Sequence, residues 1–159
     1  MFAAYGAVIR SLSIEIPDAL NSLFAFKNPK IVMPGIVAIE TVPFTTQQNA
    51  VDEMQQLSNE LLPNLEALKN VALIIITENA QFLQHELNNF LWVTFTRCNP
   101  SHDIYGIDSF TKNKHWGCKG PLVIDARIKP HHAPVLVMDP NVEQRVAHLF
   151  ENGGSLFGI

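Results

Sequence analysis

The stretch from Lys114 to Pro134 concentrates side chains that bind metals or act as nucleophiles. It holds three histidines, one cysteine and one tryptophan around a short apolar run. His115 and Cys118 have the spacing of a zinc-ligand pair, and His131 and His132 follow shortly after. The paired spacing occurs once, whereas zinc sites built from sequence pairs use two such elements. A stand-alone metal-binding protein that uses His115, Cys118 and His131 or His132 is therefore an alternative hypothesis, not the leading one.

Nucleophilic catalysis and phosphate binding have weaker support in the sequence. Neither Cys98 nor Cys118 lies in the glycine pattern of a nucleophile elbow. The glycine fingerprints of a P-loop or a Rossmann turn are absent from the sequence. Two cysteines are too few for a disulfide framework, so we expect both to be free thiols.

Charged residues within apolar segments are more informative. Arg97 closes a predicted helix that is rich in aromatic residues, and Asp125 interrupts a strand that reads as buried. A buried charge needs a partner of opposite sign. We therefore predict that Arg97 pairs with Asp103 or Asp125 and fixes the loop that follows the helix. A role for Arg97 facing a ligand is the equal alternative.

Three apolar runs provide the strands that would position these residues. They are residues 30–40, 71–77 and 121–128, and the last two are β-branched with little alternation. Such runs are typical of strands that are buried on both faces of a parallel sheet. A helical pattern follows each run, which predicts an α/β fold with three layers and a mostly parallel sheet covered by helices on both faces.

The helical patterns predict where those helices begin and end. The first helix starts at a capping box of Thr45 and Gln48 and kinks at Pro63. The second presents one apolar face and stops before Asn99-Pro100. In the third, Asp139 is the N-cap and Pro140 the first helical residue. The apolar face of the second helix comprises Leu83, Leu87, Phe90, Leu91 and Thr94, and the predicted buried stripe of the third comprises Val142, Val146 and Leu149.

Two segments fit this pattern less well. Residues 98–120 show no convincing periodicity, and loops of that length in a compact domain are usually functional or disordered. The aromatic and polar residues of this loop favour an ordered, functional loop over disorder. In the first thirty residues, a further strand near residues 7–16 and a short helix near residues 17–26 are expected. We treat residues 1–159 as one domain, in which residues 1–30 form a lead-in.

The composition indicates a soluble, cytoplasmic protein with a protein partner. The chain is 47% hydrophobic and 16% charged, against about 25% charged residues in average domains. The low charge predicts an apolar surface covered by another domain or by a second copy in a homo-oligomer. A formal net charge of −4 argues against nucleic acid as a partner. The longest aliphatic run, residues 71–76, is too short to span a membrane.

Three segments in order resemble the C-terminal domain of the UbiD family, the 3-octaprenyl-4-hydroxybenzoate carboxy-lyase-like decarboxylases. The segments are NNFLWVTFTRCNPSHDIYG, KHWGCKGPLVIDARIKPHHAP and DPNVEQRVAHLFENGGSLFGI. Leu91-Trp92 to Thr96-Arg97 and Pro100 match the helix pattern of the family, and Ile124-Asp125-Ala126 matches its Asp-containing strand. The resemblance covers residues 71–159 well and the first seventy residues only in general α/β character.

The resemblance implies a lyase, a decarboxylase of aromatic or α,β-unsaturated acids that uses prenylated flavin mononucleotide (prenylated FMN) and a metal ion. In the family these groups are bound by upstream domains, and no segment of this chain matches the catalytic Glu–Arg–Glu residues. We therefore expect no cofactor or metal bound by this chain and no activity of the chain alone. A substrate from quinone biosynthesis is a family-level expectation.

The resemblance also assigns positions within this chain. The C-terminal domain builds the oligomer and closes on the active site, and the loop from Asn99 to Gly106 approaches substrate. The expected substrate-proximal residues are Asn99, His102, Asp103 and Tyr105. The expected partner-facing residues are His115, Trp116, Lys129, His131 and His132. The partner is either a set of upstream catalytic domains in the same polypeptide or a separate catalytic subunit.

Overall fold

A computed structural model describes residues 11–133 and 139–158 of the 159-residue chain. The elements run in this order: α1 (Asp18–Asn21), β1 (Lys27–Met33), β2 (Ile36–Glu40), α2 (Gln47–Leu61), the 3-10 helix η1 (Leu62–Asn64), β3 (Leu73–Thr77), α3 (Ala80–His85), α4 (Leu87–Thr96), β4 (Ile104–Gly106), β5 (Ser109–Lys112), β6 (His115–Cys118), β7 (Leu122–Asp125) and α5 (Pro140–Phe150).

The predicted α/β class is confirmed, and the sheet is mixed. Five strands lie in the order β1-β2-β3-β7-β4. The three central strands, β2, β3 and β7, are parallel, whereas β1 and β4 pair antiparallel at the two edges. Pro34 and Gly35 are the reason for the antiparallel edge at β1, because they form a tight turn in which Gly35 has φ +76°. The apolar run 30–40 is therefore a hairpin of two strands.

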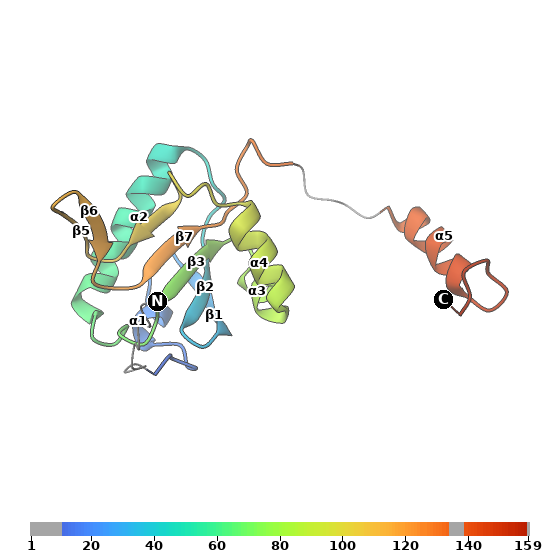
Figure 1. Cartoon of the computed structure of the whole chain (residues 1–159), viewed down its shortest axis with the longest axis horizontal. Helices are drawn as coiled ribbons and strands as arrows, with labels where there is room; N and C mark the ends of the chain where they lie inside the picture. Colours follow the sequence, from blue (N-terminus) through green and yellow to red (C-terminus); the bar gives the residue numbers. More distant parts are fainter. Residues whose placement is uncertain (1–10, 134–138, 159) are drawn as a thin grey trace, which may run out of the picture.

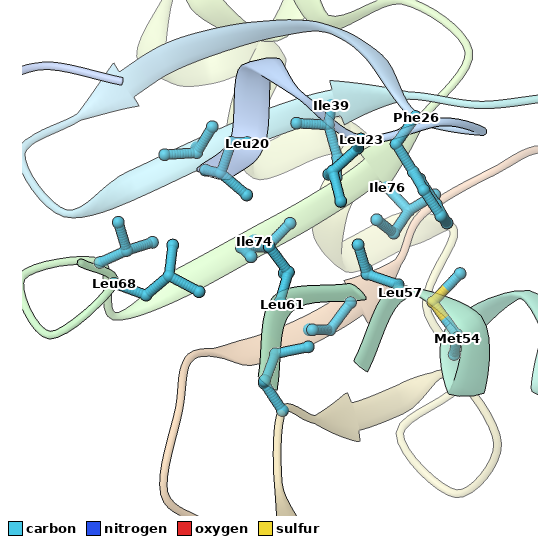
Figure 2. Close-up of a cluster of buried hydrophobic side chains, with 14 residues drawn as sticks. Leu20, Leu23, Phe26, Ile39, Met54, Leu57, Leu61, Leu68, Ile74 and Ile76 are labelled. Atoms are coloured by element: carbon cyan, nitrogen blue, oxygen red, sulfur yellow. The ribbon is translucent and has the colours of Figure 1, made fainter. Parts of the chain in front are cut away.

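Helices cover both faces of the sheet, as predicted (Figure 1). Alternate residues of β3 point to opposite sides, so Ile74 and Ile76 join one core while Ile75 joins the other. The first core lies under α1 and α2, where Leu20, Leu57 and other buried side chains fill the space against the sheet (Figure 2). The second core lies under α3 and α4.

The helix predictions are correct in outline and wrong in two details. Helix α2 begins one residue later than predicted, with Thr46 as the N-cap, and passes at Pro63 into η1. The predicted second helix is two helices, because Glu86 is extended with φ −149° and ψ 149°. The break changes which side of the helix faces the sheet. Leu87 and Leu91, which the sequence places on the same apolar face as Phe90, are therefore 54% and 42% exposed.

The segment predicted as an irregular loop, residues 98–120, contains three short strands. β4 joins the main sheet, and β5 and β6 form a separate hairpin (Figure 1). All residues of β5 are exposed, so the segment lacks the alternation of apolar and polar residues by which a half-buried strand is recognised.

The C-terminal helix differs from the prediction in its burial. Asp139 caps α5 by accepting a hydrogen bond from the Asn141 amide, and Pro140 is the first helical residue, both as predicted. However, no residue of α5 is buried, so Val142, Val146 and Leu149 do not form a buried stripe. Figure 1 shows α5 apart from the α/β body. Residues 134–138, which separate the two in the sequence, lie outside the described residues.

At the amino-terminal end, residues 1–10 lie outside the described part of the chain, and residues 11–16 form no strand. The short helix expected after them is present as α1. Among the described residues, no helix is both long and apolar enough to cross a bilayer.

Candidate functional site

Charged side chains gather where the parallel strands end. β2, β3 and β7 run in the same direction, so their carboxyl ends share one edge of the sheet. Glu40 ends β2, Glu78 follows β3, and Asp125 ends β7. In open α/β sheets this edge is the usual place for a ligand crevice. The edge is therefore the first candidate for a functional site.

Arg127 is the centre of this charged cluster and is fully buried. Its Nε and Nη2 donate to the two carboxylate oxygens of Asp125, at 2.9 and 2.8 Å. Nη1 lies 2.6 Å from Glu53 Oε2 and donates to the Val42 carbonyl at 3.0 Å. Burial alone would lower the pKa of Arg127, but the hydrogen bonds and charges of Asp125 and Glu53 raise it. The charge of the guanidinium is thus compensated by carboxylates of the chain itself, which indicates a structural role.

Lys129 is the second buried cation, at 3% exposure. Its Nζ lies 3.3 Å from Asp103 Oδ2 and donates to the carbonyls of Asp125 and Arg97, at 2.8 and 3.2 Å. The prediction that Lys129 faces a partner is therefore wrong. A lysine flanked by proline and histidines reads as exposed, but here two carboxylates and three carbonyls compensate for its burial.

Asp103 fixes the start of the loop after α4. Its Oδ2 accepts a 2.7 Å hydrogen bond from the Asn99 amide, and its own carbonyl accepts from the Asp125 amide at 2.9 Å. The predicted ion pair of Arg97 with Asp103 or Asp125 is not formed. Arg97 Nη1 lies 3.6 Å from Glu78 Oε2 instead, because Lys129 and Arg127 occupy the two aspartates.

The remaining residues of the predicted substrate-proximal loop lie beside α2. Gln47 Nε2 donates to the His102 carbonyl and to the Tyr105 hydroxyl, both at 3.2 Å. Burial raises the pKa of Tyr105 to about 12, with Asp125 and Asp103 adding to the effect. The phenol is protonated at neutral pH and is available as a hydrogen-bonding group. Proximity of Asn99, His102 and Tyr105 to a substrate remains a prediction.

Tyr105 also lines a polar groove of about 280 Å³ between α2 and the β5-β6 hairpin. Trp116 lies on the hairpin side of this groove and is 51% exposed. Gln55, Ser58 and Asn59 contribute polar groups from α2. The groove connects the predicted substrate-proximal loop with the residues predicted to face a partner.

The histidines and cysteines are not brought together into a metal site. His115 and Cys118 lie on β6, whereas His131 and His132 follow β7 and contact each other with ring centroids 4.5 Å apart. Within residues 11–133 and 139–158, no three His, Cys, Asp or Glu side chains are grouped in a way that could hold a metal ion. Cys98 and Cys118 are free thiols, and burial raises the pKa of both.

Sequence reasoning missed Glu53 and Glu78 as members of the charged cluster. Glu78 directly follows a buried strand, which was a usable signal for a position at the carboxyl edge. Glu53 stands next to the buried Met54 on α2, and nothing in its spacing distinguishes it from a solvent-facing acid. Only the tertiary fold brings Glu53 within reach of Arg127.

Comparisons with known proteins place this geometry in context. No family model matches the chain. A 4-hydroxybenzoate decarboxylase component of Chlamydia pneumoniae, named as one of the subunits of that enzyme, is 35% identical over 80 residues, which are 50% of this chain and 14% of that protein. Uncharacterized proteins of Chlamydia caviae and Chlamydia muridarum are 26% and 27% identical, over 93% and 92% of this chain and 23% of each relative. The chain thus spans less than a quarter of the length of these relatives.

Two solved structures show a weaker likeness. One is the UbiD-class enzyme HmfF from Pelotomaculum thermopropionicum in complex with FMN, at 14% identity and a TM-score of 0.46, covering 80% of this chain and 28% of that one. The other is vanillic acid decarboxylase from Sedimentibacter hydroxybenzoicus in closed form, at 18% identity and a TM-score of 0.42, covering 75% and 27%.

The match to the hydroxybenzoate decarboxylase of Chlamydia pneumoniae confirms the resemblance of this chain to a UbiD-like decarboxylase domain.

Proposed function

We propose that this chain is the C-terminal, oligomerisation and active-site-closing domain of a UbiD-like decarboxylase that acts on aromatic or unsaturated acids with prenylated FMN. The domain is not catalytic alone. The proposal carries over from the resemblance to the family and from the curated relative, which is a component of a decarboxylase. The main supporting observation concerns the carboxyl edge of the sheet, where a catalytic group would be expected. The two cations at this edge, Arg127 and Lys129, are paired with carboxylates of the chain itself and are therefore not available to a substrate.

The buried cations do not fit a phosphate-bearing flavin. A phosphate needs an accessible cation or an open set of amide donors. Arg127 and Lys129 are 0% and 3% exposed, and carboxylates already neutralise both. In this proposal the flavin and its metal belong to the catalytic domains or to a catalytic partner chain, and this chain contributes no step of the chemistry on them.

The charged cluster has a positioning role in the proposal. Asp125 holds Arg127, Asp103 holds Lys129, and Asp103 also holds the amide of Asn99 at the start of the loop. The loop from Asn99 to Tyr105 is thereby held rigidly at the sheet edge. A rigid loop can close one side of a substrate pocket without undergoing chemistry.

An activity assay of the separated and combined parts tests the proposal. We expect no release of CO2 from a panel of aromatic acids by the purified chain, with or without prenylated FMN. Release is expected when the chain acts together with the catalytic domains or the catalytic partner chain. Decarboxylation by the chain alone would overturn the proposal.

A second measurement addresses the closing role of the loop. In the assembled enzyme, Tyr105→Phe removes the hydroxyl that Gln47 contacts but keeps the ring. We expect KM to rise several-fold with a smaller change in kcat, because the loop positions substrate without reacting. The matched control is Lys119→Ala, at an exposed residue of the same region that forms an ion pair with Asp108. Equal effects of both variants on KM would contradict the closing role.

A further inference from the structure

The edge strand β4 has main-chain groups that point away from the sheet. β4 is the last strand in the sheet order and pairs on one side with β7. In an antiparallel pair, successive residues alternately bond to the neighbouring strand and face the open side. The Asp103 carbonyl accepts from the Asp125 amide at 2.9 Å, so residue 103 faces β7. By alternation Tyr105 also bonds to β7, whereas the amides and carbonyls of Ile104 and Gly106 face the open side.

The bonds of β7 agree with this orientation at Gly106. Leu122 is the register partner of Gly106 in β7. Its amide donates to the carbonyl of Ala72, the residue before β3, at 3.0 Å. Leu122 therefore bonds toward β3, and the pair with Gly106 is one in which the two residues share no hydrogen bond.

The outward groups of β4 have no partner elsewhere in the described part of the chain. Within residues 11–133 and 139–158, no loop and no side chain forms a hydrogen bond with the amide or carbonyl of Ile104 or Gly106. Gly106 is moreover a buried residue. Main-chain groups that are buried without a partner are rare in folded proteins. Their presence at one edge indicates a place where another group binds.

This open edge borders the polar groove between α2 and the β5-β6 hairpin, which projects from the body beside α2 (Figure 1). Ile104 and Gly106 both line the groove, whose volume is about 280 Å³. The hairpin packs closely on Gly106, because an added Cβ there would lie 2.5 Å from Cys118 Cβ and 3.2 Å from the Trp116 ring. The edge of β4 is thus recessed between α2 and Trp116.

The lining of the groove favours an uncharged ligand. Among the described lining residues Asp108 is the only charged one, and its carboxylate lies 2.7 Å from Lys119 Nζ. Without a cation in the lining, the groove offers no ionic partner to a carboxylate or a phosphate. Met54 and Leu62 add apolar contacts from the side of α2 and η1. An aromatic acid is therefore a poor ligand for this groove.

We propose that β4 binds an extended, uncharged peptide segment of another polypeptide as an additional strand in this groove. The free amides and carbonyls recur at the two-residue spacing from Ile104 to Gly106, and an extended peptide presents its own groups with the same repeat. Main-chain pairing provides affinity, and contacts of alternate side chains with Trp116 and Met54 provide selectivity. The site is independent of the proposed decarboxylase role and adds a binding function to the domain.

A separate peptide fits the recessed edge better than a second copy of the chain does. Paired strands must approach to about 4.8 Å. In a second copy the edge of β4 lies between α2 and Trp116 in the same way, so these walls would collide before the two edges met. An extended peptide carries no such walls and can enter the groove.

Titration of the isotope-labelled full chain with a pentapeptide, followed by NMR, tests the proposal. The probe is acetyl-Thr-Val-Thr-Val-Thr-amide, which is uncharged and favours an extended backbone. We expect saturable binding with a dissociation constant of about 1 mM, because about four main-chain hydrogen bonds form. The amide signals of Ile104 and Gly106 should shift downfield, whereas that of Leu122, already bonded to Ala72, should change little. Absence of saturation up to about 20 mM would overturn the proposal.

The matched control peptide carries N-methyl groups on its three central amides. It keeps the side chains of the probe but cannot donate main-chain hydrogen bonds in either register. We expect it to bind at least about tenfold more weakly, because both the amide donors and the extended pairing are lost. Equal affinity of the two peptides would mean that β4 adds no strand, and the proposal would fail.

Two pairs of variants locate the site. Ile104→Pro removes an outward amide and leaves the bonds to β7, whereas Ile104→Val keeps that amide. Trp116→Ala removes the hairpin wall of the groove, whereas Phe110→Ala shortens a comparably exposed residue of the same hairpin outside the groove. We expect Ile104→Pro and Trp116→Ala to weaken binding at least about fivefold and their controls to change it less than about twofold. The Trp116 pair decides the matter where the proline variant fails to fold, and equal effects within that pair would contradict the proposal.

Sedimentation of the chain with and without the probe identifies a different occupant. A dimer that the peptide dissociates and that Ile104→Pro abolishes would show that β4 pairs with a second copy, against the proposal. Failure of peptide binding would leave the proposed decarboxylase role intact, because the release of CO2 by the assembled enzyme tests that role separately.

Discussion

At the scale of single residues, the buried charges of this chain act as one unit. Asp125 is fully buried and binds Arg127 through both carboxylate oxygens, while its carbonyl accepts from Lys129. Each ion is compensated by another ion and by hydrogen bonds, which is the condition under which charges are tolerated in a core. Removing one member leaves its partner buried and unpaired. A single substitution should therefore cost more free energy than the intact pair contributes to stability.

The first prediction concerns Asp125→Ala. Arg127 would remain at 0% exposure with Glu53 left to balance its charge, so we expect the free energy of unfolding to fall by about 3–5 kcal/mol. Urea denaturation followed by fluorescence measures this. The control is Lys119→Ala, which breaks an exposed pair with Asp108 and should cost less than about 1 kcal/mol. Similar losses for the two variants would show that the buried pair contributes no more than a surface pair.

The second prediction concerns pH. Burial lowers the pKa of His132 below its ordinary 6.5, and the charges of His131, Lys129 and Arg97 add to the effect against an opposing contribution from Asp103. The neutral ring also accepts a hydrogen bond from the Lys129 amide at Nδ1, 3.0 Å away. As the pH falls below 6.5, the unfolded chain takes up the proton first, so the stability of the folded chain decreases.

We therefore expect His132→Asn to flatten the loss of stability that sets in as the pH falls below 6.5. Urea denaturation at a series of pH values measures the slope. His115→Asn, on the exposed hairpin, is the control and should keep the slope of the unmodified chain. A steeper acid slope in the His132 variant than in the unmodified chain would contradict this account.

At the scale of elements, local capping residues explain where the helices begin. The Thr46 side chain accepts from the Asn49 amide at 3.2 Å and caps α2, and Asn79 and Asp139 do the same for α3 and α5. The predicted caps were therefore correct for α5 and displaced by one residue for α2. The break at Glu86 was not predicted, because the apolar spacing continues through it.

The third prediction concerns the cap of α2. Thr46→Ala should lower the free energy of unfolding by about 1 kcal/mol, because the Asn49 amide loses its acceptor. Thermal and urea unfolding measure this. Thr45→Ala serves as the control: the Thr45 hydroxyl accepts from the exposed Asn49 side chain, so a loss below about 0.5 kcal/mol is expected. A larger loss at Thr45 than at Thr46 would reassign the cap.

At the scale of the whole molecule, the structure consists of a packed body and a helix that adds nothing to its core. The two cores draw on residues 16–126, and α5 contributes no buried residue. The low charge of the sequence predicted an apolar surface that a partner covers. The large apolar side chains that α4 and α5 expose are candidates for that surface. Partner contacts at these faces remain a proposal.

The fourth prediction concerns truncation after Ala133. At protein concentrations where the full chain is monomeric, the truncated chain should keep its free energy of unfolding within about 0.5 kcal/mol, because none of the described residues that it lacks, 139–158, is buried. At high concentration only the full chain should gain stability, through dimerisation. Urea denaturation at two protein concentrations makes the comparison. A large loss at low concentration would mean that α5 packs on its own body.

The sequence by itself determined the α/β class, the buried strands β3 and β7, the free cysteines and the cap of α5. These features follow from local apolar periodicity, from cap and turn chemistry, and from residue counts, none of which depends on distant segments. Only the tertiary structure decided that Lys129 is buried, that Arg97 pairs with Glu78, and that the apolar stripe of α5 is uncovered. The reason is physical: the partner of a buried charge and the cover of a helix face come from segments far away in the chain, and spacing within one segment carries no information about them.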